Sequence, residues 1–387
     1  EYYFNDAGRQ MRLLGESLFV RYMEFLGKNL EIPQDGYQGK YIKDIAKLFF
    51  EKYGEKYKNQ SDNQIFIDFA TENILNSIKN TLGKLGIFHK IFFKEKTLYE
   101  NGRIDEVLEK LEQKKITYKK DGAVWFKTTD FGAEKDRVLV KNSGEPTYRL
   151  PDIAYHAEKL KQNYEQIIDI FGADHHATYP DVLSALKVMD LDVSKIKVLI
   201  HQFVTLVKNK EKVKMSTRKG EFVTLDELIE IAGKDVVRYF FIMRNMSSHL
   251  NFDIELAQKE TDENPVYYLQ YAHARISNII KHSELKGIKS FEDGNVRLLK
   301  EKEEIDVLKI ISEYEEIMEL CYSTLEPMHL ANYLQKLATT FHRFYQKQRV
   351  VTEDIELSKA RLKLIKSIKI VFVNCLGILG IQAPEKM

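Results

Sequence analysis

The amino-acid sequence predicts an α/β domain built around a mostly parallel sheet, followed by an all-α helical bundle. Residues 1–245 alternate short apolar runs with helix-period segments, a pattern typical of parallel strands covered by helices on both faces. Residues 246–387 carry long apolar-periodic helices with short polar joins, which indicates a separate helical domain. The length of 387 residues agrees, because roughly two or three domains are expected at this size.

In the first region, apolar periodicity predicts both helices and strands. The predicted helices are residues 9–30, 41–53, 62–85, 103–114 and 179–189. The predicted strands are residues 1–5, 123–127, 137–140, 147–150, 167–171 and 198–207. The strand at 167–171 stops at Gly172, and the run at 198–207 leads into a basic loop.

In the second region, only helices are predicted. They are residues 265–280, 301–322, 327–345 and 355–378. A helical period is also predicted for residues 225–260, which cross the boundary between the two regions. No strand is expected beyond residue 245.

Composition excludes several classes of protein. A hydrophobic share of 44% and a charged share of 30% exclude a disordered chain. Lys and Arg number 59 against 58 Asp and Glu, so overall charge does not indicate a nucleic-acid partner. Cys321 and Cys375 cannot form a disulfide framework and fit a reducing, cytoplasmic compartment. No apolar run reaches the roughly 18 residues that a membrane span needs.

The segment from Lys214 to Gly220 is the most specific motif. Residues 201–220 hold six Lys or Arg and one acid, Glu211. Such a loop can lay cations along a polyphosphate and neutralise the charge that develops during transfer. The alternative is a solvated basic loop.

A second cluster, Gly172-Ala173-Asp174-His175-His176, follows a predicted strand and precedes Tyr179. Ligands bind beyond the carboxyl ends of parallel strands, so this loop is placed to contact one. One alternative is a helix N-cap at Asp174 with locally satisfied histidines. Another is a metal centre, since Asp-His-His is similar to the signature of the DHH phosphoesterases. Their further Asp-rich motifs are absent from the sequence, so no metal site is predicted.

A third segment, Thr147 to His156, leads from a predicted strand into a helix. Pro151 suits the first helical position, and Asp152 suits the first turn, where a carboxylate favours the helix dipole. A functional interpretation is that Tyr148 and Asp152 meet on one side of a pocket. A planar guanidinium is selected by a fixed carboxylate with a flanking hydroxyl or ring.

These motifs together resemble one family, the arginyl-tRNA synthetases. Lys214 to Gly220 resembles the KMSKS signature of class I aminoacyl-tRNA synthetases and departs from it at Thr217. Asp235-Val236-Val237-Arg238 stands where that family has its DALR tetrapeptide. Further segments resemble the family in its own order: residues 1–8, 121–126, 135–139, 172–176, 264–275 and 383–387. The resemblance covers essentially the whole chain.

The resemblance implies a Rossmann-like catalytic domain at 1–245, with a helical insertion and an incomplete N-terminus, and a DALR-type anticodon-binding domain at 246–387. It implies that ATP and Mg²⁺ activate L-arginine to arginyl-adenylate, followed by transfer to the terminal 2′-hydroxyl of tRNA(Arg) in protein synthesis. The implied ATP-binding and catalytic residues are Gly172, Asp174, His175, His176, Lys214, Met215, Ser216 and Arg218. The implied arginine-binding residues are Tyr148, Asp152 and Tyr179.

The C-terminal helices favour tRNA binding. Residues 335–387 hold ten Lys or Arg against four acids, with aromatic residues between them. The alternative is that these aromatics form the core of the bundle. By resemblance, the residues expected at the anticodon loop are Tyr268, Tyr271, Arg275, Tyr345 and Met387.

None of the ten histidines forms the His-x-Gly-His motif that precedes Glu1-Tyr2-Tyr3 in the family. We therefore expect a C-terminal portion that binds tRNA, is monomeric, and does not aminoacylate alone. The alternative within the class is another KMSKS synthetase, such as the cysteinyl type.

Overall fold

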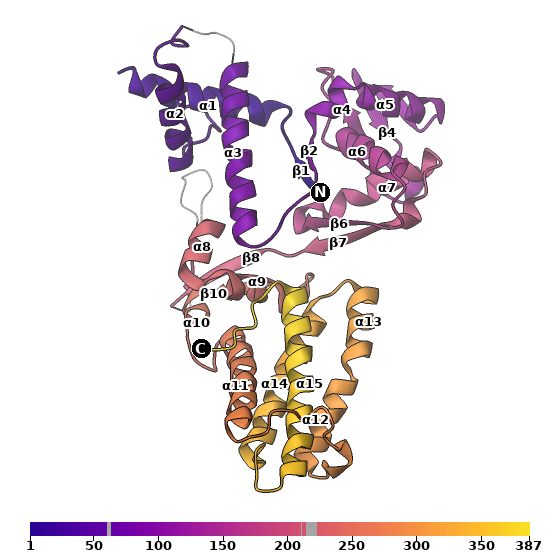
Figure 1. Ribbon diagram of the computed structural model, residues 1–387. Coiled ribbons are helices and arrows are strands. Elements are labelled where there is room, and N and C mark those ends of the chain that lie inside the picture. The colour runs from indigo at the N-terminus through magenta and orange to yellow at the C-terminus, as the bar shows by residue number, and fades with distance from the viewer. Residues whose placement is uncertain (60–62, 210, 214–222) are drawn as a thin grey trace. The chain divides into compact units, whose positions relative to one another are not determined.

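The computed structural model describes residues 1–59, 63–209, 211–213 and 223–387 (Figure 1). The chain divides into two compact units. The first comprises Glu1–Gly83 and Ile87–Phe203, and the second comprises Lys84–Gly86, Val204–Val213 and Val223–Met387. Within the described ranges, no helix has both the length and the apolar character to span a membrane.

The first unit begins with a helical cluster around an aromatic core. Its helices are α1 (Arg9–Phe25), α2 (Lys40–Tyr53) and α3 (Gln64–Lys84). Tyr22, Phe49 and Phe66 are buried, and the Phe49 and Phe66 ring centroids lie 4.7 Å apart. All three helices confirm the prediction, although α1 ends five residues early because Gly27 adopts a left-handed φ of 75°.

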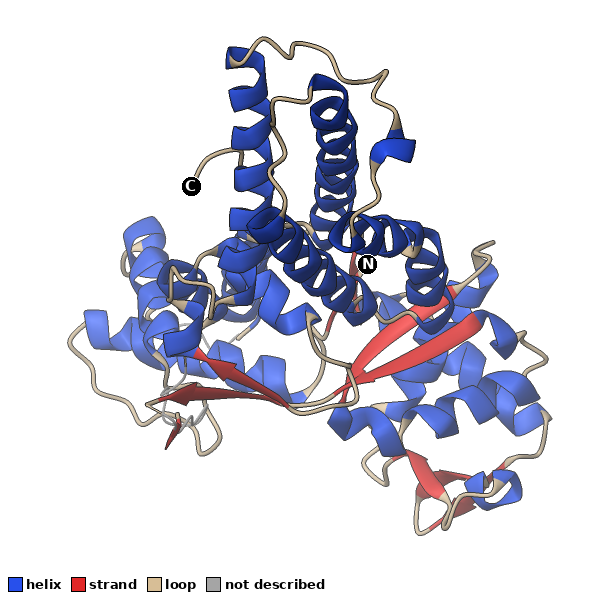
Figure 2. Cartoon of the chain, turned by 90° about the horizontal axis from the view of Figure 1, so that it is seen from below, coloured by secondary structure: helices blue, strands red, loops and turns tan. Residues whose placement is uncertain are grey.

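The rest of the first unit combines short strands with helices (Figure 2). Strands β1 (Tyr2–Phe4) and β2 (Phe92–Lys94) pair in parallel, as do β6 (Ile167–Gly172) and β7 (Ile196–His201). Strands β3 (Thr117–Lys120), β4 (Ala123–Phe126) and β5 (Arg137–Val140) form an antiparallel sheet. The helices are α4 (Lys96–Glu100), α5 (Arg103–Gln113), α6 (Arg149–Lys161) and α7 (Tyr179–Val188). A second apolar core, including Phe126, Leu139 and Ile153, lies between these elements.

Two predictions for this unit are wrong. Residues 147–150 are not a strand: Tyr148 already has helical dihedral angles, so α6 begins at Arg149 and Pro151 is its third residue. The apolar run at 198–207 is two strands, β7 and β8 (Val204–Lys208), which pair in different sheets. The described strands form four separate small sheets rather than one, and β2 and β3 were not expected.

The second unit contains a small sheet of its own. Strand β8 pairs in parallel with β10 (Leu250–Asp253) and antiparallel with β9 (Glu211–Lys212). The expectation of no strand beyond residue 245 is therefore wrong. Leu250 and Phe252 are buried while Asn251 is exposed, which is the alternation of a strand. The strand was missed because this alternation is short and lies between helical segments. The neighbouring helices are α8 (Leu225–Ala232), α9 (Lys234–Ile242) and α10 (Ile254–Ala257).

The second unit continues as the predicted helical bundle (Figure 1). Its helices are α11 (Pro265–Leu285), α12 (Lys302–Ser312), α13 (Tyr314–Thr324), α14 (Met328–Lys347) and α15 (Ile355–Leu379). The single helix predicted at 301–322 is two helices. They separate at Glu313, whose backbone N–H donates to Ile310 O three residues back and tightens the chain into a turn.

A buried ion pair joins two helices of the bundle. Arg361 Nε of α15 donates to Glu304 Oε1 of α12 at 2.7 Å, and Glu304 is fully buried. Arg361 also donates to Arg349 O and to Gln348 Oε1 in the loop that precedes α15. The guanidinium thus ties α12, α15 and this loop together.

The end of α15 is held by the tetrapeptide that contains Arg238. Arg238 Nε donates to Leu379 O at 2.9 Å, and Arg238 Nη1 donates to Leu85 O at 2.8 Å. Gly380 caps α15 with a left-handed φ of 69°, and a Cβ added there would lie 2.5 Å from Arg238 Nη2. Both the backbone conformation and the space therefore require glycine at this position.

Replacing Arg361 with Met would leave the Glu304 carboxylate buried without its partner. We expect the free energy of unfolding to fall by about 3–5 kcal/mol in urea denaturation. The control is Lys336→Met, which breaks an exposed ion pair with Glu313 at 2.8 Å and is expected to cost at most about 1 kcal/mol. Equal effects of the two substitutions would contradict the role assigned to Arg361.

Two glycines of the same helix end make a second, matched test. Gly380→Ala forces a left-handed alanine against Arg238 and is expected to cost about 1–3 kcal/mol of unfolding free energy. Gly377→Ala meets open space within α15 and is expected to be neutral or to stabilise by up to about 1 kcal/mol. The account of the helix end is wrong if both variants unfold at the same denaturant concentration.

Candidate functional site

Strands β6 and β7 place the Asp-His-His segment at the edge of a sheet. They pair in parallel with Gly172 opposite His201, so both carboxyl ends lie at the same edge. Residues Ala173–Ala177 form a 3-10 turn directly after β6, and α7 begins at Tyr179. The loop therefore stands where parallel sheets bind their ligands, as the sequence predicted.

The loop is held by local contacts. The His175 ring stacks on Phe171 with centroids 5.1 Å apart, and His175 O accepts a hydrogen bond from Thr178 N at 2.9 Å. The N-cap position of α7 is Thr178, so the alternative that Asp174 caps this helix is wrong. In the described part of the chain, no three His, Cys, Asp or Glu side chains converge in a way that could hold a metal ion.

Helix α6 is attached to β6 through a buried charge cluster next to Asp152. His156 bonds through Nδ1 to Asp152 O at 2.7 Å and through Nε2 to Asp169 Oδ2 at 3.0 Å, and Lys159 pairs with the other oxygen of Asp169. Burial raises the pKa of Asp169, but His156 and Lys159 outweigh burial and hold that pKa below its usual value. Both His156 nitrogens therefore lie within hydrogen-bond distance of an oxygen atom.

The Asp152 carboxylate lies in the first turn of α6 and faces a small cavity. His175, Tyr179 and Phe171 also line this cavity, so the structure brings together three residues that the sequence singled out: Asp152, His175 and Tyr179. Burial raises the pKa of Asp152, and the positive charges of its neighbours, His156 first, oppose that rise. The cavity has a volume of about 10 Å³, and the carboxylate that lines it is largely desolvated.

Tyr148 lies one helical turn from Asp152 but lines different cavities. Its side chain is 57% exposed, and the Arg149 guanidinium lies 4.9 Å from its ring centroid. The cavity that Tyr148 lines includes Glu95, Tyr99 and Pro151. The described structure thus does not place Tyr148 and Asp152 on one cavity wall, and their joint role stays a prediction.

Glu95 is a candidate site residue that the sequence interpretation missed. It is 8% exposed and accepts hydrogen bonds from Tyr3 Oη at 2.9 Å and Tyr99 Oη at 3.4 Å. Burial raises the pKa of Glu95, and the charge of Asp152 raises it further. The sequence carries only a weak signal for this site, since Tyr99 follows Glu95 by four residues. Nothing in the sequence indicated that the distant Tyr3 also donates to Glu95.

The structure gives no position for the basic segment Lys214 to Gly220. Lys214, Met215, Ser216 and Arg218 lie outside the described residues. Their assignment to the phosphates of ATP remains a prediction.

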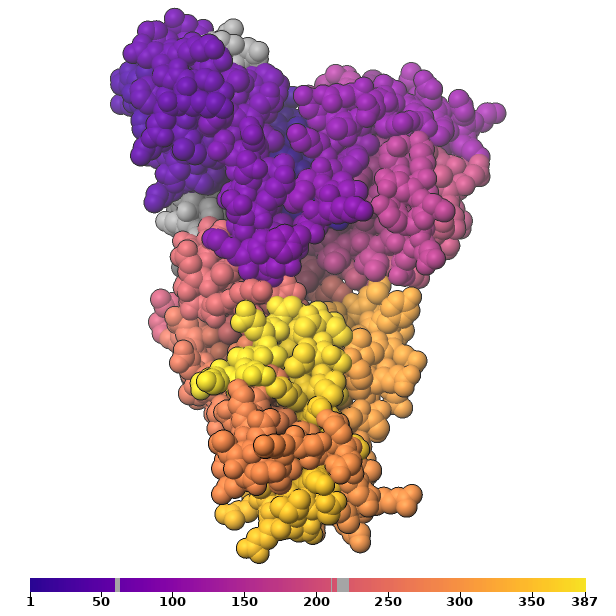
Figure 3. Space-filling model, in the orientation of Figure 1, coloured from indigo at the N-terminus to yellow at the C-terminus, as the bar shows by residue number. Residues whose placement is uncertain are grey.

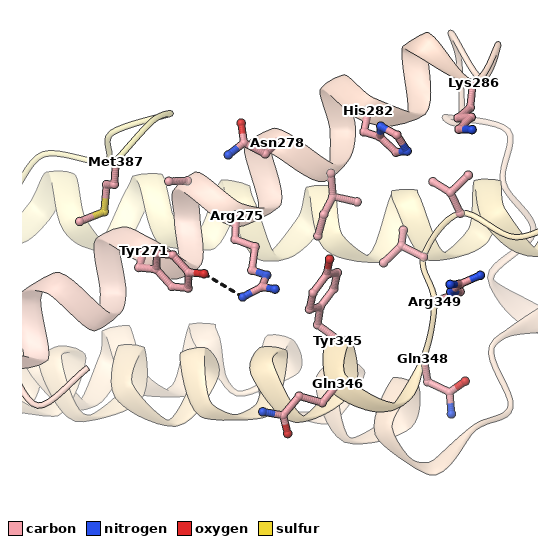
Figure 4. A pocket seen from close by; sticks show the side chains of 14 residues that line it. Tyr271, Arg275, Asn278, His282, Lys286, Tyr345, Gln346, Gln348, Arg349 and Met387 are labelled. Carbon is pink, nitrogen blue, oxygen red and sulfur yellow. Dashed lines mark hydrogen bonds between the residues drawn. The ribbon is translucent and has the colours of Figure 1, made fainter. Parts of the chain in front are cut away.

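The second unit contains a groove of about 910 Å³ that brings together four of the five residues expected at the anticodon loop (Figure 4). They are Tyr271 and Arg275 of α11, Tyr345 of α14, and Met387. Arg275 Nη1 donates to Tyr271 Oη at 2.9 Å, and its guanidinium lies 4.4 Å from the Tyr345 ring centroid. Arg349 and Lys286 add positive charge to the groove wall.

Tyr268, the fifth expected residue, lies beside the groove rather than in its lining. Its ring packs 4.9 Å from His342. Phe341 and Phe344 are fully buried, so the alternative that the C-terminal aromatics form core is correct for these two and not for Tyr345. Desolvation, then the charge of Arg275, lowers the pKa of His342.

The C-terminal tail is held against α11 (Figure 3). Gln382 N donates to Asp235 Oδ2 at 3.1 Å, and His273 Nδ1 bonds to Pro384 O at 2.8 Å. Glu385 accepts from Lys369 at 2.8 Å and from Lys281 at 3.4 Å. These contacts position Met387 at the groove.

Two protein families match this chain. Residues 24–280 match the family described as the catalytic domain of class I (R) tRNA synthetases. Residues 269–387 match the DALR anticodon binding domain.

Individual relatives agree. The arginine–tRNA ligase of Desulfotalea psychrophila is 49% identical over 389 residues, covering 100% of this chain and 70% of that relative. The arginine–tRNA ligase of Thermotoga maritima is 44% identical over 391 residues, covering 100% of this chain and 72% of that relative.

Solved structures agree as well. An arginyl-tRNA synthetase structure from Campylobacter jejuni superposes with a TM-score of 0.90 at 32% identity, covering 100% of this chain and 84% of the other. The Thermus thermophilus arginyl-tRNA synthetase, at 19% identity and a TM-score of 0.76, covers 100% of this chain and 75% of the other and shares the fold. Neither the cysteinyl nor the phosphoesterase alternative is favoured. This chain belongs to the arginyl-tRNA synthetase family of class I enzymes, and its function is that of an arginine–tRNA ligase.

Proposed function

We propose that two buried carboxylates, Asp152 and Glu95, select the arginine side chain for this ligase. Both are largely desolvated, and each lies beside tyrosine hydroxyls or rings. A guanidinium carries a permanent charge and five N–H donors in one plane, so it can bridge acceptors that a neutral side chain cannot satisfy. The observation that carries this proposal is that two largely buried carboxylates form no salt bridge with any residue that the structure describes.

The energetics favour a cationic ligand at this place. Burial raises the pKa of both carboxyl groups, and the charge of Asp152 raises the pKa of Glu95 further. A guanidinium bound between them would remove that repulsion and stabilise both ionised forms. Tyr148 and Tyr179, at the margins of the two cavities, would contribute ring and hydroxyl contacts.

We also propose how ATP meets this site. Gly172, Asp174, His175 and His176, at the carboxyl ends of β6 and β7, would contact the adenosine and α-phosphate. Lys214, Ser216 and Arg218, with Met215, would serve the pyrophosphate, and Arg218 or Lys219 would replace the second Lys of the signature. Mg²⁺, bound mainly through phosphate oxygens and water, would neutralise charge on the leaving pyrophosphate.

The chemistry would then depend on positioning and charge neutralisation. The arginine carboxylate attacks the α-phosphorus of ATP, and pyrophosphate leaves. The terminal 2′-hydroxyl of tRNA(Arg) next attacks the arginyl carbonyl, and AMP leaves. No step requires a covalent bond to the protein, so the residues act by holding reactants in line.

For the rest of the chain, we propose a catalytic domain at 1–245 and an anticodon-binding domain at 246–387. The groove that contains Tyr271, Arg275, Tyr345 and Met387, with Tyr268 beside it, would stack and pair with unstacked bases of tRNA(Arg). We further propose a monomer in the cytoplasm. The two free cysteines, Cys321 and Cys375, fit the reducing conditions of that compartment.

Replacing Asp152 with Asn is expected to weaken arginine binding about 100-fold, because Asn retains the shape but not the charge. The affinity of the wild-type chain for arginine should also fall on acidification, because protonation removes the charge of Asp152. Since the pKa of Asp152 is raised, this fall should occur at a higher pH than it would if the carboxyl group were exposed. Equilibrium dialysis with labelled arginine, with tRNA present, measures both effects.

The control for this experiment is Asp130→Asn, which removes an exposed carboxylate from the same unit. It should leave arginine affinity and its pH profile unchanged. Unaltered affinity in Asp152→Asn would show that the pocket has been assigned to the wrong residue.

Replacing Tyr345 with Ala removes the ring under the Arg275 guanidinium and is expected to weaken tRNA binding about 10-fold. Tyr345→Phe keeps the ring and should bind nearly as well as wild type. Tyr322→Ala, an exposed tyrosine on α13 outside the groove lining, is the matched control. Filter binding with a tRNA(Arg) transcript measures all three, and equal losses for Tyr345→Ala and Tyr322→Ala would exclude the groove.

A further inference from the structure

The first turns of α6 and α7 are joined by a buried ion pair. Arg149, the first residue of α6, donates through Nε to Asp181 Oδ2 of α7 at 3.0 Å. Asp181 is 6% exposed and the Arg149 side chain 13% exposed, so water and salt screen this pair poorly. The two helices also share one apolar core, which contains Ile153 of α6 and Val182 of α7. The ion pair adds a directional contact at the ends where both helices begin.

These first turns carry the residues proposed to recognise arginine. Tyr148 directly precedes α6, and Asp152 lies in its first turn. Tyr179 is the first residue of α7 and lines the same small cavity as Asp152. The pair of Arg149 with Asp181 is therefore formed by close neighbours in the chain of all three proposed contacts.

Arg149 also supports the ring of Tyr148. Its guanidinium carbon lies 4.9 Å from the Tyr148 ring centroid, which is a cation–π distance. The tyrosine otherwise remains exposed and lines the cavity that contains Glu95. A planar guanidinium can donate to a carboxylate within its plane and stack on a ring through its face, whereas a lysine ammonium lacks this geometry. Arg149 can therefore fix Tyr148 and the contact between the helices together.

A second guanidinium lies beside Asp181 without forming this contact. Arg137 Nε of β5 lies 3.5 Å from Asp181 Oδ2, the same oxygen that Arg149 contacts. Among the residues that the structure describes, Arg137 Nε is a buried nitrogen without a hydrogen-bond partner. Arg137 thus adds positive charge beside Asp181, whereas the directional bond belongs to Arg149.

We infer that Asp181 and Arg149 are positioning residues for arginine recognition. Their ion pair holds the first turn of α6 against that of α7, and so fixes Asp152 and Tyr148 relative to Tyr179. The inference rests on the proposed function, which assigns these last three residues to the arginine side chain. Neither member of the pair would touch the substrate. Their effect would still be large, because a displacement of about 1 Å can cost about 100-fold in a site that depends on geometry.

The test compares L-arginine with L-citrulline, whose urea group has nearly the shape of the guanidinium but no charge. Equilibrium dialysis with labelled arginine, citrulline as competitor and tRNA present gives both affinities. Asp181→Asn is expected to weaken arginine binding about 10-fold and to leave citrulline binding within about 2-fold of the wild-type value. The reason is that a neutral ligand depends less on correctly placed carboxylates. A merely structural role of the pair would lower both affinities by the same factor.

Arg149→Lys is the second variant, and it keeps the charge balance of the site. It therefore reports on the pair even if Asp181→Asn does not fold. Its ammonium cannot both donate to Asp181 and stack on Tyr148, so arginine binding is expected to weaken about 5-fold and citrulline binding to stay nearly unchanged. The matched control is Arg137→Lys, which makes the same change in the other guanidinium beside Asp181. This control should leave both affinities within about 2-fold of the wild-type values.

Three results would overturn the inference while the proposed function stands. The first is a wild-type ratio of arginine to citrulline affinity in Arg149→Lys and in a folded Asp181→Asn. The second is an equal loss of affinity for both ligands, which would assign the pair to the fold alone. The third is a loss in Arg137→Lys as large as that in Arg149→Lys. A wild-type chain that does not distinguish arginine from citrulline would refute the proposed function, and the inference with it.

Discussion

The buried Asp169 carboxylate is the interaction on which the proposed arginine site depends most. It lies on β6 and pairs with His156 and Lys159, both on α6. One strand therefore carries the loop proposed to bind ATP at its end and also anchors the helix that presents Asp152. Because His156 also bonds to Asp152 O, any movement of α6 along β6 would displace the carboxylate and the loop relative to each other.

Buried charge serves a related purpose in the second unit. Glu304 and Arg361 are almost completely buried, and Arg361 fixes the loop that contains Arg349, which lines the groove proposed to bind the anticodon. A buried ion pair contributes little net stability compared with apolar residues of the same size. Its geometry is demanding, however, and it specifies one arrangement of the helices. Both units thus use desolvated charges to position residues at their proposed binding surfaces.

Local sequence patterns predicted the helices well and the pairing of strands poorly. Helical period is set by neighbours three and four residues apart, so α2, α3 and α15 were located almost to the residue, whereas α11 extends five residues beyond its predicted end. Strand β10 was missed because its partner, β8, lies more than 40 residues earlier, and four residues carry little periodicity. Glu95 was missed for the same reason: its burial depends on Tyr3, which pairing of β1 with β2 brings to it.

The C-terminal aromatics show a different limit. Phe341, Phe344 and Tyr345 are all compatible with the apolar face of one helix, and only packing against the neighbouring helices separates two core residues from one groove residue. Periodicity identifies which residues share the apolar face of a helix. Which of those residues are exposed depends on the neighbouring helices that pack against that face. The loop after β6 does follow a parallel strand, as the sequence indicated, and its role in ligand binding stays a prediction.

The central claim is that ionised carboxylates recognise the charge of arginine. The most direct measurement compares the binding of L-arginine with that of L-citrulline, which has nearly the same shape but a neutral urea in place of the guanidinium. The account predicts that arginine binds at least about 100-fold more tightly at neutral pH, and that the ratio shrinks as acid protonates Asp152 and Glu95. Equal affinities at neutral pH, or a ratio that does not change with pH, would contradict it.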